Sequence, residues 1–471
     1  MNACHVSRLC MVATVAAIGA GMGWGQAVTA QNSRTDFEDG VQVLTRGPVH
    51  EAFAETVIFD PEPGIVVIKA PPESIEELPP DQRPEGSNVD WIPGYWAWDE
   101  ERDDFLWVSG TWRSLPPGRE WVPGYWGRTR RGFQWTSGYW ADAEASEIQY
   151  LPEPPATVEI GPNIAPPSAD ESWIPGSWVW HQDRYAWRPG YWMIVQPDWD
   201  WVPAHYIWAP RGYVFVDGYW DYSVDRRGVL FAPVYFKSSV YARTGFTYSP
   251  ATVINLSVFS DHLFVRPRYN HYYFGDYYAP SYRDSGFYAS FSFHSGRQGY
   301  DPIYAQQRWR HRQDPEWGRR VKANFSYRRD HEDARPFHTL AAQVRYRQSD
   351  ARRGERSYAL ASSVEQYLHA ADNRLRFRRV NDDERRQAAH RGKDIQHFRK
   401  ERQRAEVDAA AERTPSRSEP IRMKARRSPI GARPADQLDK HDAPPRRPEP
   451  PKPDPKVEPK AKKTKEKRDR P

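Results

Sequence analysis

The sequence predicts a mainly β protein: a meander of Trp-rich β-hairpins with short capping strands, followed by α-helical segments and a disordered basic tail. Three observations predict this class. A Trp-x-x-Gly-x-Trp pattern recurs between Trp91 and Trp220, aromatic residues alternate within its copies, and charge and aromatic content both change near residue 228. A Gly in nearly every copy, and a Pro in most, argue against a helix, because both residues destabilise helix interiors.

The eight copies fall into two blocks of four. The blocks occupy residues 91–140 and 173–228, and a Pro/Glu-rich linker at 141–172 separates them. Within each copy, aromatic residues at alternate positions share one face of an extended chain. Each copy therefore predicts one strand and one turn. The copies begin at Trp91, Trp107, Trp121, Trp135, Trp173, Trp187, Trp201 and Phe215.

The spacing inside one copy predicts a local irregularity. Its two tryptophans lie five residues apart, so a regular strand would direct them to opposite faces. A β-bulge at the central Gly would add one residue and bring both to the same face. We therefore expect a bulge at positions such as Gly124, between Trp121 and Trp126. One copy alone buries too little area to offset its ordering entropy, so we expect stability only from an array.

The motif resembles the WXXGXW (also written YXWGXW) repeat family of bacterial exported proteins. Seven of the eight copies keep the central Gly; the seventh has Ala204, and the eighth opens with Phe215. The resemblance covers about a quarter of the chain. It implies export and a β repeat, and it implies no reaction. A fainter similarity connects the copies with the longer Gly-Trp repeats of choline-type cell-wall binding modules.

The first 30 residues have the pattern of a signal peptide. An n-region with one Arg precedes an apolar run, and Val28-Thr29-Ala30 then predicts cleavage between Ala30 and Gln31. The run is short for a membrane anchor, although an uncleaved anchor is the alternative. Both cysteines, Cys4 and Cys10, lie within this segment, so a mature chain would lack disulfides and thiol ligands. We expect an exported protein of the periplasm, outer envelope or extracellular space.

The segments outside the array are less regular. Residues 31–90 are a Pro/Glu-rich N-terminal segment, and residues 229–300 predict a Tyr-rich region with capping strands at 230–236, 252–259 and 263–265 that close the second block. Residues 301–413 predict a basic, helical and partly disordered arm, with helices over 302–330, 374–379 and 381–412. Asn381 and Glu384 have the spacing of a capping box. Residues 414–471, rich in Lys, Arg and Pro, are expected to be disordered.

The charge distribution suggests a partner. Residues 31–228 contain 15 Lys/Arg against 32 Asp/Glu, whereas residues 229–471 contain 51 against 30. A basic arm of this kind predicts binding to anionic envelope polymers or polysaccharide. The export signal argues against nucleic acid as a partner in vivo. The alternatives are a solubilising tail, or an arm that folds back on the acidic body.

The aromatic residues allow two interpretations. They are either the core, which is favoured because other apolar residues are scarce, or a platform on which sugar rings stack. The histidines lack metal-ligand spacing, and no catalytic motif is present, so we expect no metal, no cofactor and no enzymatic activity. The sequence thus predicts an envelope-associated structural or adhesion protein; the alternatives are a carbohydrate-binding module and an unrecognised envelope enzyme. The candidate core or glycan-stacking residues are Trp96, Trp98, Trp107, Trp126, Trp135, Trp178, Trp180, Trp187 and Trp192.

Overall fold

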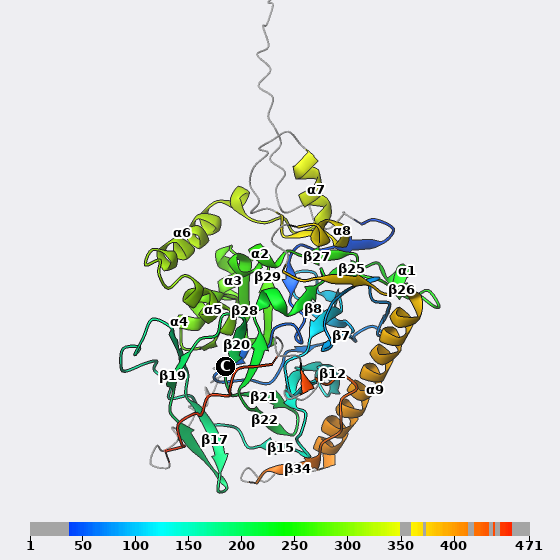
Figure 1. Cartoon of the computed structure of the whole chain (residues 1–471). Coiled ribbons are helices and arrows are strands. Elements are labelled where there is room, and N and C mark those ends of the chain that lie inside the picture. The colour runs from blue at the N-terminus through cyan, green and yellow to red at the C-terminus, as the bar shows by residue number, and fades with distance from the viewer. Residues whose placement is uncertain are drawn as a thin grey trace, which may run out of the picture.

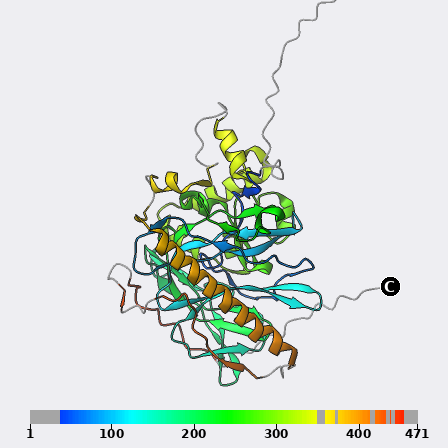
Figure 2. The same ribbon diagram turned by 90° about the vertical axis from the view of Figure 1, so that its right-hand side faces the viewer.

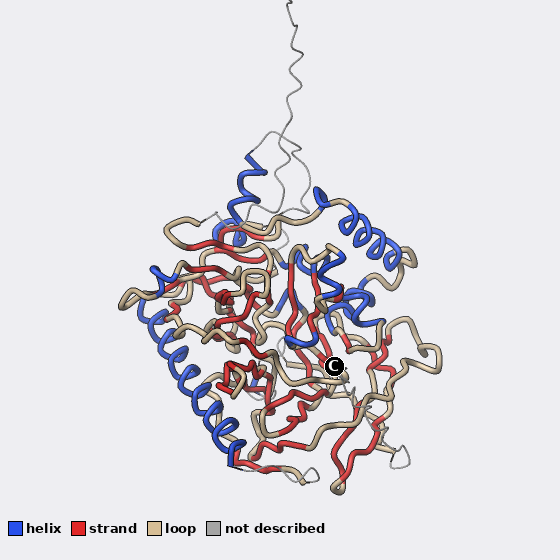
Figure 3. Tube along the Cα trace, turned by 180° about the vertical axis from the view of Figure 1, so that it is seen from behind, coloured by secondary structure: helices blue, strands red, loops and turns tan. Residues whose placement is uncertain are grey.

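The computed structural model describes residues 37–348, 359–370, 374–412, 419–432, 437–438 and 443–454. The predicted cleavage site at Ala30 and Gln31 lies outside these residues. Small antiparallel sheets make up most of the body, and short helices gather at one end (Figure 1, Figure 3). The long helix α9 (Asp382–Glu412) runs along one side (Figure 2). Among the described residues, no helix is both long and apolar enough to cross a bilayer.

The Trp-rich region folds into four β-hairpins, each built from two copies of the motif. They are called hairpins 1 to 4 and span residues 89–114, 119–142, 171–194 and 199–222. The strands of hairpins 1 and 2 are β7 (Val89–Ile92), β8 (Tyr95–Asp99), β9 (Asp104–Val108), β10 (Thr111–Ser114), β11 (Arg119–Val122), β12 (Tyr125–Thr129), β13 (Gly132–Thr136) and β14 (Tyr139–Asp142). Those of hairpins 3 and 4 are β16 (Glu171–Ile174), β17 (Ser177–His181), β18 (Arg184–Arg188), β19 (Tyr191–Ile194), β20 (Trp199–Val202), β21 (His205–Ala209), β22 (Gly212–Val216) and β23 (Tyr219–Tyr222).

Each hairpin is interrupted at its centre without a change of register. In hairpin 1, Trp91 lies opposite Trp112 in the outer pair β7–β10, and Trp96 lies opposite Trp107 in the inner pair β8–β9. The ladder skips residues 93–94 on one strand and 109–110 on the other. A bulge would add a residue to one strand only and shift the register, so the predicted β-bulge is wrong. The other three hairpins show the same symmetrical interruption.

Strands from elsewhere in the chain extend three of the hairpins, and none of the four hairpins shares a sheet with another in the described part of the chain. The added strands are β1 (Val41–Val43), β4 (Val66–Val67), β15 (Glu147–Leu151), β24 (Gly228–Leu230), β25 (Val234–Phe236) and β34 (Ile421–Lys424). β24 pairs with β10, and β25 pairs with β9. The expectation that strands after residue 229 close the second block is therefore wrong: they cover hairpin 1, because the chain leaves hairpin 4 beside hairpin 1. β15 comes from the predicted linker and pairs with β34, from the predicted tail.

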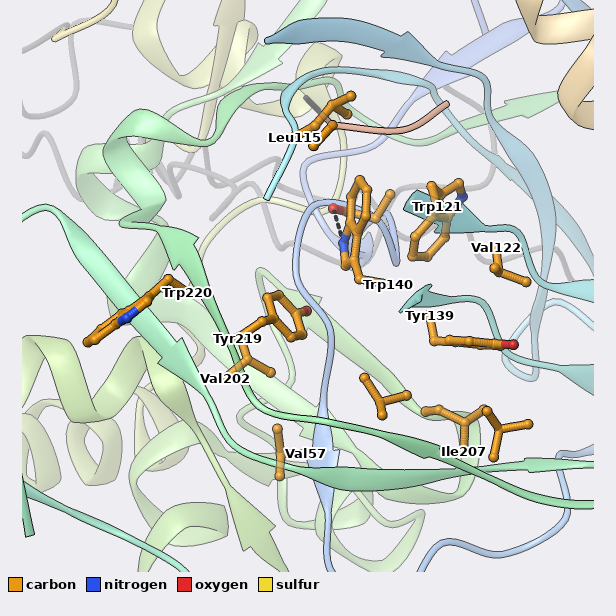
Figure 4. Packing of buried hydrophobic residues seen from close by; sticks show 14 of the residues in the cluster. Val57, Leu115, Trp121, Val122, Tyr139, Trp140, Val202, Ile207, Tyr219 and Trp220 are labelled. Atoms are coloured by element: carbon orange, nitrogen blue, oxygen red, sulfur yellow. Dashed lines mark hydrogen bonds between the residues drawn. The ribbon is translucent and has the colours of Figure 1, made fainter. Parts of the chain in front are cut away.

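The segment before the array lies at the centre of the molecule. Residues 44–58 are all buried. The backbone oxygen of Ala52 accepts hydrogen bonds from Arg113 Nε at 2.8 Å and from Trp140 Nε1 at 3.2 Å. Figure 4 shows Val57 of this segment in one cluster with Trp140 of hairpin 2 and with Val202 and Tyr219 of hairpin 4. The hairpins are thus packed around an N-terminal segment rather than stacked in a row.

The remaining elements are short. The strands are β2 (Gly47–Pro48), β3 (Val57–Ile58), β5 (Glu76–Glu77), β6 (Gln82–Pro84), β26 (Thr247–Tyr248), β27 (Thr252–Ile254), β28 (Leu263–Arg266), β29 (His271–Phe274), β30 (Tyr288–Ala289), β31 (Gly299–Tyr300), β32 (Ala361–Ser363) and β33 (Phe377–Arg379). The helices are α1 (Ser238–Tyr241), α2 (Leu256–Phe259), α3 (Pro280–Asp284), α4 (Ser290–Ser295), α5 (Pro302–Arg310), α6 (Trp317–Asp330), α7 (Leu340–Gln348) and α8 (Val364–Leu368).

The structure confirms the predicted helices at 302–330 and 381–412, the first as α5 and α6 and the second as α9. The capping box is present: the backbone N–H of Glu384 donates to Asn381 Oδ1 at 2.9 Å, and that of Asn381 donates to Glu384 Oε2 at 3.1 Å. The predicted helix at 374–379 is wrong. Leu375 and Phe377 alternate with arginines, which places both apolar side chains on one face of an extended segment, and β33 pairs with β6.

The predicted strand at 252–259 is confirmed only in its first part. β27 ends at Ile254, because the side chain of Asn255 then caps α2 by accepting a hydrogen bond from the backbone N–H of Ser257.

Candidate functional site

Most of the candidate tryptophans are core residues in this structure. Opposed pairs meet edge to face or tilted; the rings of Trp96 and Trp107, for example, meet edge to face with centroids 5.2 Å apart. A tryptophan with no exposed face has no surface on which a sugar could stack. Trp126, Trp180 and Trp192 are half-buried. The side chains of Trp96, Trp98, Trp107, Trp135, Trp178 and Trp187 are only 0–8% exposed.

The central glycines allow these indoles to pack against the backbone. A Cβ on Gly94 would lie 2.8 Å from Cε2 of Trp107, and one on Gly110 would lie 2.5 Å from Cζ2 of Trp91. Both distances are far shorter than a normal carbon–carbon contact. The motif therefore needs Gly because the indole of the opposite strand occupies the place of a side chain.

A buried carboxylate fills the interruption of hairpin 1. The break leaves the N–H groups of Gly94 and Gly110 without ladder partners, and Glu77 accepts both, at 2.7 and 3.1 Å. Glu77 also accepts the indole N–H of Trp107 at 2.6 Å. Its side chain is supplied by β5, outside the hairpin, and only 4% of the residue is exposed. Glu77 therefore acts as an acceptor that replaces the missing ladder bonds.

In hairpins 2 and 3 a buried glutamate accepts one glycine N–H and one indole N–H. In hairpin 3, Glu159 accepts from the backbone of Gly176 at 2.5 Å and from the indole of Trp173 at 3.1 Å. In hairpin 2, Glu51 accepts from the backbone of Gly138 at 3.0 Å and from the indole of Trp135 at 3.2 Å.

Hairpin 4, in which Ala204 replaces one glycine, has different contacts. There Glu55 contacts His205 Nε2 at 3.1 Å and accepts the hydroxyl of Tyr219 at 2.6 Å. The sequence reasoning missed these glutamates, although a signal was present for two of them: Glu77 and Glu159 each precede the first glycine of their hairpin by 17 residues.

Burial changes the ionisation of these groups. Loss of solvation raises the pKa of Glu51 to about 8 and that of Glu77 to about 7. The half-buried Arg399 of α9 lies near both, and loss of solvation lowers its pKa to about 10. Among the described residues, no group of three or more His, Cys, Asp or Glu could hold a metal ion. The glutamates hold together the two strands of a hairpin, and no substrate-binding role follows from their contacts.

Helix α9 satisfies the opposite side of the interruption in hairpin 2. Arg402 Nη1 donates to the carbonyl oxygens of Pro123 and Ser137, at 2.9 and 3.0 Å. Its Nε donates to Glu406 at 2.9 Å, and Glu406 also accepts the hydroxyl of Tyr125 at 2.7 Å. This part of the predicted basic arm is therefore packed into the body.

Further ion pairs connect the arm to the body. Arg391 Nη2 lies 2.8 Å from Asp90 Oδ1, and Lys393 Nζ lies 2.9 Å from Glu76 Oε1. Within α9 itself, eight Lys/Arg are matched by eight Asp/Glu. The net charge of α9 is therefore zero, with histidines neutral.

A buried ion network links the first hairpin to the last. Arg113 of β10 donates to both carboxylate oxygens of Asp221 on β23, at 2.6 and 2.7 Å. Arg227 Nε lies 3.2 Å from Asp221 Oδ2, and Arg227 Nη2 lies 2.6 Å from Asp200 Oδ2 on β20. All four side chains are at most 3% exposed. Because an unpaired buried charge is strongly unfavourable, this network fixes hairpin 1 against hairpin 4.

A groove of about 330 Å³ lies where hairpins 2, 3 and 4 meet β15. Trp180 and Phe215, both half-buried, supply aromatic surface in it. Arg119 and Arg188 supply donors, and carboxylates such as Asp217 supply acceptors. Aromatic rings beside donors and acceptors are the elements of a site for a polar ring-shaped ligand.

Comparison with protein families agrees with the hairpin boundaries. The model of the WXXGXW repeat, which describes two copies, matches residues 86–113, 121–141, 173–193 and 197–221. No curated protein and no solved structure matches the chain. Each of the four matches corresponds to one hairpin. The four Trp-rich hairpins of this protein are therefore made of WXXGXW repeats.

Proposed function

We propose that this chain is an exported, non-enzymatic protein of the cell envelope, with a structural or adhesive role that depends on binding an anionic polymer. The motif's resemblance to repeats of exported proteins and the signal-like N-terminus support export. The observation that carries the polymer-binding role is helix α6. It has five Lys/Arg and one Asp, and none of its residues is buried.

The placement of α6 distinguishes it from α9. Residues 302–348, which contain α5 to α7, carry 11 Lys/Arg against 5 Asp/Glu, a net charge of +6. In Figure 1, α6 and α7 lie toward the upper end of the body and α5 lies nearer its middle. Arg319 and Arg320 of α6 pair with Glu316 and Asp314, but all four side chains are more than one-third exposed. Exposed pairs of this kind contribute about 0–1 kcal/mol, so a polyanion can compete for the cations.

The test compares two charge-matched variants of the full chain on a column of immobilised heparin. Heparin, a sulfated polysaccharide, serves as a model ligand for an anionic envelope polymer. One variant replaces four exposed cations of α6 by Gln; the other replaces four exposed cations of α9. Binding that releases counterions weakens steeply with salt. We expect the α6 variant to elute at clearly lower salt, and the α9 variant to elute close to the wild type. The replaced residues are Arg319, Arg320, Lys322 and Arg329 in α6, and Arg386, Lys393, Lys400 and Arg404 in α9.

Equal elution of the two variants would contradict the role of α6, and a wild type that passes through the column at low salt would contradict polyanion binding altogether. Export is tested separately by mass spectrometry of the N-terminus after expression with the native leader. We expect a mature chain that starts at Gln31. An intact Met1 would refute cleavage.

The groove between hairpins 2, 3 and 4 favours a second candidate function, the binding of an envelope glycan. Trp180 is half-buried in its wall, and a sugar ring can stack on an aromatic face while hydroxyls bond to Arg and carboxylate groups. Calorimetric titration with cell-wall oligosaccharides tests this function. We expect Trp180→Ala to abolish binding. Trp208→Ala, at a half-buried residue outside the groove, should retain it. No heat in the wild type would eliminate this candidate.

A further inference from the structure

The C-terminal stretch 443–454 has two different faces. It contains six prolines and no helix. All six prolines are half-buried, whereas Arg446, Arg447, Glu449 and Lys452 are exposed. Since Pro fixes φ near −65°, a segment of this composition favours the extended polyproline II conformation. The prolines are thus turned toward the body and the charges toward solvent.

This stretch contacts two hairpins. The indole N–H of Trp220, in hairpin 4, donates to the backbone oxygen of Arg446 at 3.3 Å. The guanidinium of Arg447 pairs with Asp217, also in hairpin 4. The backbone N–H of Asp454 donates to the oxygen of Trp187 in hairpin 3 at 2.6 Å. The stretch, drawn in red in Figure 1, therefore spans hairpins 3 and 4.

These contacts are those expected of a proline-rich ligand. A polyproline II chain has no internal hydrogen bonds, so its carbonyl groups are free to accept. A tryptophan indole offers one donor on a flat apolar ring, which suits a surface of pyrrolidine rings and free carbonyls. The strand β18 belongs to a two-stranded sheet, so its second edge is open to Asp454. Because prolines restrict the free chain, binding orders it at a small entropic cost.

We infer that the outer surface of hairpins 3 and 4 is a recognition site for a proline-rich extended peptide, and that residues 443–454 occupy it as a ligand in cis. The bound stretch contacts both hairpin 3 and hairpin 4, which share no sheet within the described residues. The site is separate from α6, so this inference does not depend on polyanion binding. Another proline-rich peptide gains access only when the cis segment leaves.

The test uses a fluorescent peptide of the sequence 443–454 and three full-length chains. The first is the wild type. The second has alanine in place of the six prolines, Pro444, Pro445, Pro448, Pro450, Pro451 and Pro453. The third is the matched control, Glu449→Ala with Lys452→Ala, which changes exposed charges of the same stretch but keeps its prolines. Fluorescence anisotropy reports binding, and circular dichroism checks that each chain is folded.

The expected result follows from competition. A tethered segment has an effective concentration on the order of 1 mM, so a peptide with a Kd of about 100 μM should bind the wild type about tenfold more weakly than the six-alanine chain. The charge control should behave like the wild type, and a labelled peptide with alanines in place of prolines should not bind. Trp220→Phe in the six-alanine chain keeps the ring but removes the indole N–H, and it should weaken binding.

Three outcomes would overturn the inference. The first is equal affinity of the peptide for all three chains, and the second is no binding to any of them. The third is binding by the alanine peptide that disappears with salt, which would show attraction by Arg446 and Arg447 alone. Heparin elution of the six-alanine chain is measured in parallel, so a failure here is distinguishable from a failure of the proposed function.

Discussion

Replacement of Glu77 tests whether this buried glutamate stabilises the interruption of hairpin 1 by accepting the N–H groups there. Glu77→Ala leaves three buried donors without an acceptor: the N–H groups of Gly94 and Gly110 and the indole of Trp107. Each such donor costs about 1–3 kcal/mol, so three cost about 6 kcal/mol at about 2 kcal/mol each. Part of this loss is offset, because the variant no longer buries a carboxylate.

The offset follows from the ionisation of Glu77. Burial raises its pKa from 4.5 to about 7, and this increase corresponds to about 3 kcal/mol of unfavourable free energy for the ionised form. The expected net loss in the free energy of unfolding is therefore about 3 kcal/mol. The neighbouring Glu76 is the matched control: it forms an ion pair with Lys393 at 2.9 Å, and both side chains are about half exposed. Loss of such a pair is worth less than about 1 kcal/mol.

Urea unfolding of the two variants, followed by tryptophan fluorescence and far-UV circular dichroism, measures the difference. We expect Glu77→Ala to unfold at clearly lower urea than Glu76→Ala. Glu77→Gln, which keeps one carbonyl oxygen as acceptor, should lie between Glu77→Ala and the wild type. If the two alanine variants have the same midpoint, Glu77 does not stabilise the interruption, and the explanation of how these hairpins hold together is refuted.

Three other perturbations follow from the same packing. Gly124→Val should lower the free energy of unfolding by about 3 kcal/mol or more, because a Cβ would lie 2.6 Å from the ring of Trp135. Arg130→Val, at an exposed turn, should change it by less than about 0.5 kcal/mol. Equal urea midpoints of the two variants would contradict the contact. Burial raises the pKa of Glu51 to about 8, so the folded state holds this proton more tightly than the unfolded state; the resulting stability is complete below about pH 4.5 and is lost as pH rises through 8. Urea midpoints between pH 6 and 9 should therefore fall with pH, and less steeply in Glu51→Gln; midpoints that rise would show the opposite linkage. Gly392→Ala should raise the thermal midpoint by the equivalent of about 1 kcal/mol, because this helical Gly has room for a methyl group 3.5 Å from the nearest neighbouring side chain; a lower midpoint would show that α9 packs more tightly than described.

The sequence predicts the hairpins well because aromatic alternation is a local signal. The predicted bulge is wrong, although the sequence contains the pattern that argues against it. In an antiparallel pair, Trp91 and Trp96 face Trp112 and Trp107, and both strands have the same five-residue interval. A bulge in one strand would misalign these pairs, so equal spacing in both copies favours a symmetrical interruption.

The buried glutamates that bond to the hairpins, and the central segment 44–58, are much harder to predict from the sequence. Glu51 reaches Gly138 across 87 residues, and no periodicity connects two positions so far apart. Strands of two residues, such as β3 and β5, have no alternation to detect. The burial of residues 44–58 depends on four hairpins that are all later in the chain. Such pairings follow from packing in three dimensions and leave little trace in a single sequence.

The ion network between Arg113 and Asp221 has a consequence for how such a protein can change in length. In a solenoid each repeat touches only its neighbours, so copies can be gained or lost at little cost and can melt one by one. Here an ion pair connects the first hairpin to the last. One N-terminal segment also supplies Glu51 to hairpin 2 and Glu55 to hairpin 4 as hydrogen-bond acceptors. A duplicated hairpin would have no space among the packed hairpins and no buried glutamate to accept the N–H groups at its interruption. The copy number is therefore fixed by the surrounding chain, and the four hairpins should melt together in a single transition.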